Sequence, residues 1–276
     1  MKIIILILKN KEVSCLAKII SVITQKGGVG KTTIVNALAS TLTHSGCRVL
    51  VIDMDPQGNL SFSVGADTEN TNTIYEMLKG EVNPLSAIQR MPMTDVIPAN
   101  ILLSGIELEF TGKNREYLLH KALDPLIKLY DYILIDSPPG LGILTINALT
   151  ACDYVIIPLV PDVFALQGLT LVYDTIEHIS QNINPKIAVA GVLMNRFSKY
   201  IKMHREIYGT AKMICDKLNI NLFKTTIHEC RAFAESHTMQ NDITVHGEKT
   251  KATKDFSKFL KELESIFTVL EMRING

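Results

Sequence analysis

Eight residues near the start of the chain, KGGVGKTT at positions 26–33, restrict its possible folds more than any other feature. An apolar, β-branched run at 19–24 precedes them and predicts a strand that is buried on both faces. Apolar residues at helical spacing follow Lys31, and Gly46 stands where a left-handed helix terminator is expected. A strand, a glycine-rich loop and a helix in this order bind phosphate, because the loop N–H groups and the helix N-terminus converge on one anion.

The alternation of strand and helix continues along the chain. Segments with helical periodicity separate further apolar runs, which is the pattern of a parallel sheet. The expected fold class is therefore α/β, a doubly wound, mostly parallel sheet with helices on both faces. From residue 59 to residue 100 the pattern is weaker, and we expect one short helix at 74–78 within connections that cross one face. The further predicted strands are 49–52, 132–135, 154–157 and 187–193.

Length and composition fit one globular domain. The 276 residues suffice for a full core, and we expect a single domain at 17–276 after an extension at 1–16. The extension holds an apolar run at 3–8 that is too short for a membrane span, and it is either an extra edge strand or a non-native start. Five scattered cysteines without a CxxC pair indicate neither disulfides nor a zinc site, which fits a reducing cytoplasm. The 28 basic and 28 acidic residues balance, so nucleic acid would have to bind at a local patch.

Each residue of the glycine-rich loop has an expected role. Lys31 meets the β- and γ-phosphates, the Thr32 hydroxyl is a ligand for Mg²⁺, and Thr33 helps to hold the α-phosphate. A turn that merely joins a strand to a helix is the alternative, but the GKT run in register with both elements argues against it. The backbone of four preceding residues forms the phosphate cradle: Gly27, Gly28, Val29 and Gly30.

Three aspartates follow predicted strands and complete the expected site. Alternation along the strand places the side chains of Asp53 and Asp55 on the same side, towards the phosphates. We expect Asp53 near Mg²⁺ and Asp55 near the attacking water, although turn formation before Pro56 is an alternative role for both. Asp136 ends another apolar strand and is expected to hold Mg²⁺ through water, as a Walker B carboxylate does.

Lys26 is a second lysine in a loop that already has Lys31, and with these motifs the chain resembles the ParA/MinD family of deviant-Walker P-loop ATPases. In that family this lysine reaches the nucleotide of the opposite subunit, so the resemblance implies a homodimer when ATP is bound. The run DMDPQGN at 53–59 looks like the family's second phosphate-site motif, and PLVPDVFALQGL at 158–169 also looks like the family. The segment IHECRAFAESH at 227–237 resembles a stretch of Soj-type chromosomal ParA proteins.

The resemblance extends over roughly residues 17 to 271 and is strongest to Soj-like partition proteins. It implies ATP or ADP and Mg²⁺ as ligands, and Lys26, Lys31 and Asp55 as catalytic residues of slow, partner-stimulated ATP hydrolysis. It also implies non-specific DNA and a ParB/Spo0J-like activator as partners, and a role in plasmid or chromosome partition at the nucleoid in the cytoplasm. Three residues depart from the family pattern: His228, Cys230 and Phe233.

Two further sets of residues are candidates for contacts outside the phosphate site. Asn195, at the end of a predicted strand, is expected either to contact adenine or to cap the strand end. Five basic residues form the expected DNA surface, because lysine and arginine neutralise phosphate groups, with a solvated helix face as the alternative. In Soj-like proteins dimers bind DNA through such residues. The five are Arg196, Lys199, Lys202, Arg205 and Arg231.

Two other functions stay open on the sequence alone. A MinD-like, membrane-associated positioning ATPase would carry a basic amphipathic helix at its C-terminus. The C-terminal segment has an apolar stripe, but its polar face mixes lysine and glutamate, so we expect it to pack on the sheet and do not favour a membrane partner. An ATP-dependent binding regulator with negligible turnover is the second alternative. The stripe consists of Phe256, Phe259, Leu260, Leu263, Phe267 and Leu270.

Overall fold

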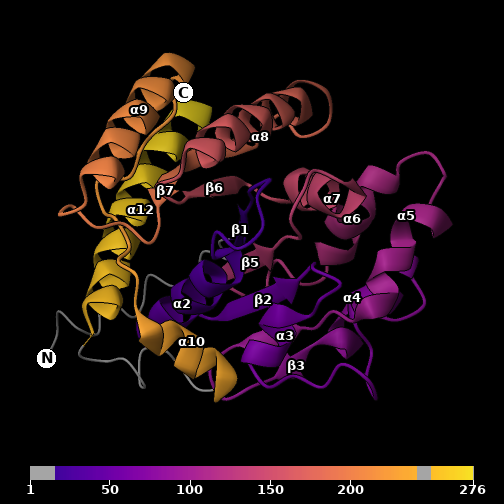
Figure 1. The fold of residues 1–276 in the computed structure, drawn as a ribbon. Helices are drawn as coiled ribbons and strands as arrows, with labels where there is room; N and C mark the ends of the chain where they lie inside the picture. Colours follow the sequence, from indigo (N-terminus) through magenta and orange to yellow (C-terminus); the bar gives the residue numbers. More distant parts are fainter. Residues whose placement is uncertain (1–15, 241–249, 276) are drawn as a thin grey trace, which may run out of the picture.

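The computed structural model describes residues 16–240 and 250–275, so the expected N-terminal extension lies outside the described part except for Leu16. A seven-stranded sheet runs through the molecule in the order β3-β4-β2-β5-β1-β6-β7 (Figure 1). Neighbouring strands are parallel except for the antiparallel β3 and β4. The strands are β1 (Lys18–Val22), β2 (Val49–Asp53), β3 (Gln89–Arg90), β4 (Asp95–Ile97), β5 (Tyr132–Asp136), β6 (Tyr154–Leu159) and β7 (Ala188–Met194).

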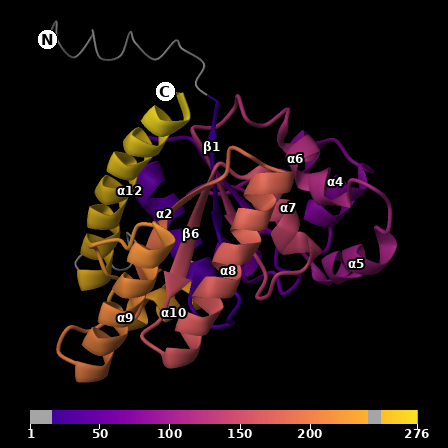
Figure 2. The ribbon, with the colours of Figure 1, turned by 90° about the horizontal axis from the view of Figure 1, so that it is seen from above.

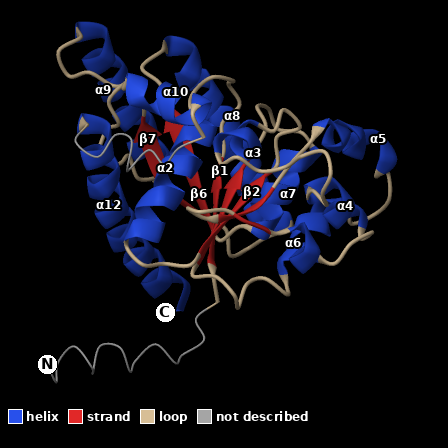
Figure 3. Cartoon of the chain, turned by 90° about the horizontal axis from the view of Figure 1, so that it is seen from below, coloured by secondary structure: helices blue, strands red, loops and turns tan. Residues whose placement is uncertain are grey.

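Helices cover both faces of the sheet (Figures 2 and 3). One core lies between the sheet and α2, α10 and α12, and the other between the sheet and α4, α6, α7, α8 and α9. Among the described residues, no helix is both long and apolar enough to cross a membrane. The α-helices are α2 (Lys31–His44), α3 (Asn59–Ser63), α4 (Ile74–Lys79), α5 (Ile106–Glu109), α6 (Leu118–Leu123), α7 (Ile143–Ala151), α8 (Val163–Asn182), α9 (Lys202–Leu218), α10 (Arg231–Thr238) and α12 (Lys251–Asn275).

The architecture predicted from the sequence, a doubly wound and mostly parallel α/β fold, is confirmed. Each predicted strand begins and ends within two residues of an observed one, because burial on both faces produces the continuous apolar runs that the prediction used. The predicted short helix is α4, whose N-terminus is capped by a capping box formed by Thr73 before the helix and Glu76 in its first turn. The apolar stripe of α12 also packs in the core as expected, with Phe259 edge-on to Phe223 at a centroid distance of 4.8 Å.

Residues 59–100 differ from the prediction of simple connections across one face. This segment places β4 parallel to β2 and then pairs β3 with β4 at the edge of the sheet. Val96 and Ile97 of β4 are fully buried. A strand of three residues has too few positions to produce a readable alternation, so only its pairing with β2 reveals it.

The order of the central strands decides where the candidate functional residues meet. β5 lies between β2 and β1, and Asp136 at its end pairs with Asp53 on β2 and with Val22 on β1. The loop that follows Val22 and the two carboxylates therefore share the carboxyl edge of three adjacent strands. Ligands of open α/β sheets bind at this edge.

Candidate active site

The glycine-rich loop between β1 and α2 has the backbone of an anion site. Gly28 and Gly30 have φ angles of 74° and 95°, in the left-handed region that favours glycine. α2 begins at Lys31, and no described side chain caps its N-terminus. The N–H groups of the first turn and the positive end of the helix dipole are therefore available to an anion.

Lys31 places a buried positive charge at the start of α2. Only 7% of its surface is exposed, and this burial lowers the pKa of its ammonium group. The nearby carboxylates of Asp136 and Asp55 act in the opposite direction and favour the charged form. The fold thus brings together three of the predicted residues, which lie far apart in the sequence.

A hydroxyl and a carboxylate form the candidate metal site. Thr32 Oγ1 donates to Asp136 Oδ2 at 2.6 Å, whereas the buried Asp136 Oδ1 has no hydrogen-bond partner among the described residues. Burial, and then the neighbouring Asp53, raise the pKa of Asp136 well above its usual range. This oxygen pair suits Mg²⁺, which binds one or two protein oxygens and completes its shell with phosphate and water.

Asp53 lies beside Asp136, but its carboxylate is held by the backbone and by Ser61. Its Oδ2 accepts the Ser61 N–H at 2.8 Å and the Ser61 hydroxyl at 2.7 Å, and its Oδ1 accepts the Asp55 N–H at 3.1 Å. Burial raises the pKa of Asp53 to about 6, although these hydrogen bonds act to lower it. Asp53 therefore anchors the segment that carries Asp55, and its direct role at Mg²⁺ stays a prediction. Sequence analysis missed Ser61, because nothing in its spacing marks it.

Asp55 follows β2 at the same edge of the sheet. It is 9% exposed, and its Oδ1 accepts the Gln57 N–H at 3.0 Å, which holds the carboxylate in a local turn. Its negative charge acts on the Lys31 ammonium. Asp55 is thus a fixed acceptor beside the phosphate loop, as the orientation of a water molecule would require.

Lys26 has a different environment from Lys31. Its ammonium lies 3.0 Å from Asp162 Oδ2, and 42% of the Lys26 side chain is exposed. The other oxygen of Asp162 caps α8 by accepting the Phe164 N–H at 2.7 Å. Of the two lysines in the loop, one is therefore buried near the carboxylates and the other lies at the outer surface.

Asn195 comes directly after β7 and lies against the phosphate loop. Its Nδ2 donates to the Val29 carbonyl at 2.7 Å, and its Oδ1 accepts the Arg196 N–H at 2.9 Å. Both ends of the amide thus bind the backbone, in keeping with a role at the end of the strand. The contact with adenine stays a prediction.

Comparison with known proteins shows where this arrangement occurs. A family model described as an AAA domain matches residues 17–189, which is more than half of the chain. The chromosome partitioning protein ParA of Myxococcus xanthus is 35% identical over 250 residues, which cover 89% of this chain and 87% of that protein. The sporulation initiation inhibitor protein Soj of Bacillus subtilis is 34% identical over 254 residues, or 90% and 98% of the two chains. The chain belongs to the ParA family of P-loop ATPases.

A solved structure joins the same fold to a nucleotide and a metal. Cobyrinic acid a,c-diamide synthase from Mycobacterium smegmatis, with bound ATP analogue and magnesium, is 32% identical to this ParA-family chain, with a TM-score of 0.73. The match covers 86% of this chain and 98% of that one. The glycine-rich loop and the Thr32–Asp136 pair are the groups of the present chain that fit such ligands.

The predicted DNA-binding residues of the ParA-family chain are exposed, but they lie on separate elements. Arg231 begins α10, a helix that contacts α3. The others follow one another from the end of β7 into the first turn of α9, and the Arg205 guanidinium donates to the Lys199 carbonyl at 2.7 Å. Four of the five therefore lie, exposed, on one continuous stretch of the chain: Arg196, Lys199, Lys202 and Arg205.

A basic row on α12 escaped the sequence analysis. Glu262 and Glu264 made this face look mixed in sign, and Glu264 is indeed exposed. Glu262, however, and the nearby Asp255 are engaged by other parts of the chain. Asp255 Oδ2 lies 2.6 Å from His228 Nδ1, and Glu262 accepts the N–H groups of Lys224 and Thr225 at 2.7 and 2.9 Å. The exposed lysines of α12 are three or four residues apart, so they lie on one side of the helix. The row consists of Lys251, Lys254, Lys258 and Lys261.

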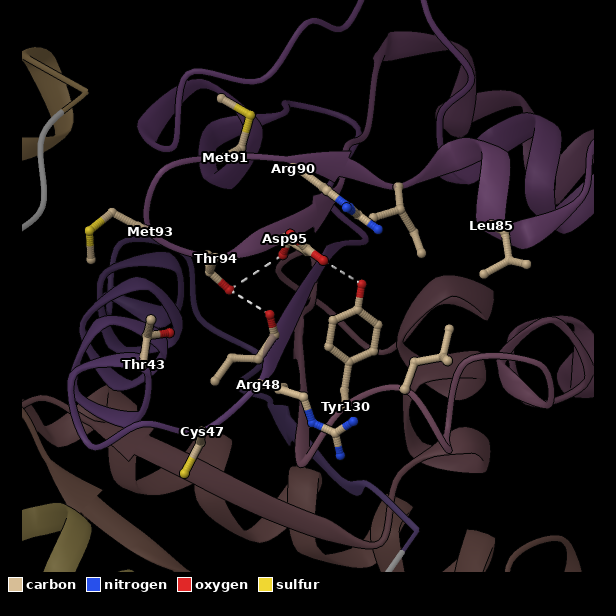
Figure 4. A pocket seen from close by; sticks show the side chains of 13 residues that line it. Thr43, Cys47, Arg48, Leu85, Arg90, Met91, Met93, Thr94, Asp95 and Tyr130 are labelled. Atoms are coloured by element: carbon tan, nitrogen blue, oxygen red, sulfur yellow. Dashed lines mark hydrogen bonds between the residues drawn. The ribbon is translucent and has the colours of Figure 1, made fainter. Parts of the chain in front are cut away.

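A separate cavity of about 560 Å³ lies at the opposite edge of the sheet, near the first residues of β2 and β4 (Figure 4). Within it the Tyr130 hydroxyl donates to Asp95 Oδ2 at 2.6 Å. Arg48, also in its lining, pairs with Asp131 at 3.0 Å. None of the predicted phosphate or metal residues lines this cavity, so it is distinct from the ATPase site.

Asp136→Asn should abolish the Mg²⁺-dependent part of nucleotide binding without destabilising the nucleotide-free protein. The amide avoids the cost of a buried carboxylate, but it cannot offer Mg²⁺ an anionic oxygen. Thermal unfolding in ADP, with and without Mg²⁺, measures this. A ligand at a hundred times its dissociation constant stabilises the wild type by about 2.7 kcal/mol, and the part of this gain that Mg²⁺ adds should vanish in the variant.

Asp153→Asn is the matched control, because Asp153 is a half-buried carboxylate whose pKa burial also raises, but it lies away from the phosphate loop and accepts the Ile19 N–H near the start of β1. This variant should keep the full response to Mg²⁺. An equal response in Asp136→Asn would contradict the assignment of the metal site.

Proposed function

We propose that this ParA-family ATPase is a dimeric switch that binds DNA without sequence preference when it holds ATP and releases the DNA after hydrolysis. Family membership makes it an ATPase with ATP, ADP and Mg²⁺ as ligands. The observation that carries the switch is the contrast between the buried Lys31 and the exposed Lys26 in one loop. The switch serves plasmid or chromosome partition at the nucleoid in the cytoplasm, with a ParB/Spo0J-like protein as its activator.

The nucleotide of a second copy is the target proposed for Lys26. Its pair with Asp162 is exposed to solvent, and such pairs contribute about 0–1 kcal/mol, so exchanging the carboxylate for a phosphate costs little. Val163 and Phe164 follow Asp162 directly and are 59% and 71% exposed. Large apolar side chains next to an available cation suit a surface that is covered in a dimer.

Hydrolysis is phosphoryl transfer to water, which depends on positioning and on compensation of charge. Lys31 and Lys26 of the second copy neutralise charge on the transferred group. Bound Mg²⁺, held by Thr32 and Asp136 with Asp53 beside them, supplies further compensation. Asp55, fixed by the Gln57 N–H, orients the attacking water. The backbone from Gly27 to Gly30, together with Thr33, holds the remaining phosphate oxygens.

DNA binding without sequence preference requires cations at phosphate spacing and no contacts to bases. The four basic residues from the end of β7 to the first turn of α9 supply one such surface, and Arg231 is a further candidate. The lysine row of α12 supplies a second surface. The apolar side of α12 already lies in the core, with Phe256, Phe259 and Phe267 at most 2% exposed. This favours DNA over lipid for the lysine row, because a membrane-binding helix needs its apolar side for the bilayer.

Lys26→Ala should prevent the ATP-dependent dimer and leave nucleotide binding by the single chain nearly unchanged, because Lys31 stays in place. Sedimentation velocity with Mg²⁺ and a non-hydrolysable ATP analogue should detect a dimer of the wild type and a monomer of the variant. Asp162→Asn removes the charge that pairs with Lys26 but keeps an oxygen for the Phe164 N–H, so it should still dimerise. If Lys26→Ala formed the dimer at the same protein concentration as the wild type, this role of Lys26 would be refuted.

Asp55→Ala should retain ATP binding and ATP-dependent DNA binding but lose turnover. Positioned acid–base groups contribute about 100- to 10,000-fold, so phosphate release should fall at least 100-fold. Measurement of phosphate release with excess ATP, alongside nucleotide affinity, separates the two effects. Wild-type turnover would eliminate Asp55 as the group that orients water.

Removal of two lysines from a DNA-binding surface should flatten the dependence of affinity on salt. Each phosphate contact contributes about 1 to the slope of log affinity against log salt, so Lys254→Ala/Lys258→Ala should lower the slope by about 2 for each chain of the dimer that contacts DNA. Lys199→Ala/Lys202→Ala tests the other surface in the same way. The measurement is co-sedimentation with DNA in a non-hydrolysable ATP analogue over a series of salt concentrations, with ADP as the reference.

Lys121→Ala/Lys128→Ala is the charge-matched control. Both lysines are exposed, and they lie near residues 127–131, which are hydrogen-bonded to the start of β1 and belong to neither proposed DNA surface. This pair should leave the slope unchanged. If neither test pair changes the salt slope more than the control pair does, DNA does not bind at either surface. If DNA binds equally well in ADP and in the ATP analogue, the proposed switch is contradicted.

A further inference from the structure

We propose that Asn195 is a positioning residue for nucleotide binding, which holds the phosphate loop in its receptive conformation independently of any contact with the adenine base. The side-chain amide acts on the loop backbone, and the effect reaches the phosphates through that backbone. This inference requires only nucleotide binding by the ATPase, and does not depend on the proposed dimer or on DNA.

The sheet fixes the position of Asn195. Its backbone N–H donates to the carbonyl of Leu159, the last residue of the adjacent β6, at 2.7 Å. The residue is 6% exposed. An amide anchored to the end of the sheet in this way is a rigid point against which a glycine-rich loop can be held.

The bond to Val29 controls the direction of a phosphate-binding N–H group. Asn195 Nδ2 donates to the Val29 carbonyl at 2.7 Å, and Val29 is itself only 1% exposed. That carbonyl shares a planar trans peptide unit with the N–H of Gly30, so the two groups point in opposite directions. Holding the carbonyl towards Asn195 therefore turns the Gly30 N–H away from Asn195.

Close packing leaves the loop little room to depart from this arrangement. A Cβ atom added to Gly30 would lie 2.6 Å from Asn195 Nδ2, a distance that real Cβ atoms do not reach. Gly30 also has a φ angle of 95°, which glycine adopts without strain. Gly30 and Asn195 are thus matched to each other across 165 residues of sequence.

The orientation of the amide follows from its two partners. Oδ1 accepts the Arg196 N–H at 2.9 Å, while Nδ2 faces the Val29 carbonyl. A flipped amide would set oxygen against oxygen and N–H against N–H, so only one orientation satisfies both groups. An aspartate at this position could still accept from Arg196, but it would present a negative oxygen to the Val29 carbonyl.

A ligand without a base separates positioning of the loop from recognition of adenine. Isothermal titration of Mg²⁺-ATP and of Mg²⁺-tripolyphosphate into the wild type, Asn195→Asp and Asn195→Ala measures both. We expect both ligands to weaken by the same factor, about tenfold, because a buried carbonyl loses its hydrogen bond. Weakening of ATP alone would assign Asn195 to the base, and unchanged binding of both ligands would eliminate any role.

Amide hydrogen exchange without nucleotide gives a second readout. In both variants exchange should accelerate at residues 26–32 and stay unchanged in the central strands, whereas general destabilisation would accelerate exchange throughout the sheet. Asn184→Asp is the matched control, because Asn184 Nδ2 also donates to backbone carbonyls, those of Leu149 and Cys152. Unchanged exchange at 26–32 in folded Asn195→Ala, or an equal effect in the control, would overturn the proposal.

Discussion

Two buried carboxylates at the ends of the neighbouring strands β2 and β5 require compensating positive charge, and this requirement determines the arrangement of the carboxyl edge of the sheet. Asp53 and Asp136 occupy paired positions on β2 and β5, and burial raises the pKa of both. A buried charge is stable only beside a group of opposite charge, and two buried like charges that lie close together require such a group even more strongly. Lys31 supplies one cation. Asp136 Oδ1, which has no hydrogen-bond partner in the described part of the chain, is the atom at which we propose that a metal ion supplies another.

The surrounding loop segments depend on this charge cluster but face in different directions. Asp53 is hydrogen-bonded to Ser61 and to the Asp55 backbone, so the strand that carries one carboxylate also positions the next. Lys26 pairs with Asp162 at the outer surface instead. The same loop can therefore bind a nucleotide of its own chain through the buried Lys31 and present the exposed Lys26 at the surface, as the proposed dimeric switch requires.

Much of the fold and part of the site could be predicted from sequence, because both rest on periodic patterns. Apolar runs located five of the seven strands, and the residues that directly follow two of these runs, Asp53 and Asp136, were thereby placed at the carboxyl edge. β4 could not be found in this way, since its three residues are defined by pairing with β2. Ser61 has no pattern of its own, and its importance follows only from its bonds to Asp53.

The sequence by itself determined the order of strand, loop and helix, the phosphate-binding character of residues 26–33 and the doubly wound class. These features depend on backbone preferences and on the pattern of apolar residues, and both are determined by residues that are close together in the sequence. Only the tertiary structure decided that Asn195 meets the Val29 carbonyl, and that Asp255 and Glu262 turn from the surface of α12 to partners in the chain. Contacts of this kind join residues distant in sequence, so they exist only once the packed strands and helices bring those residues within reach.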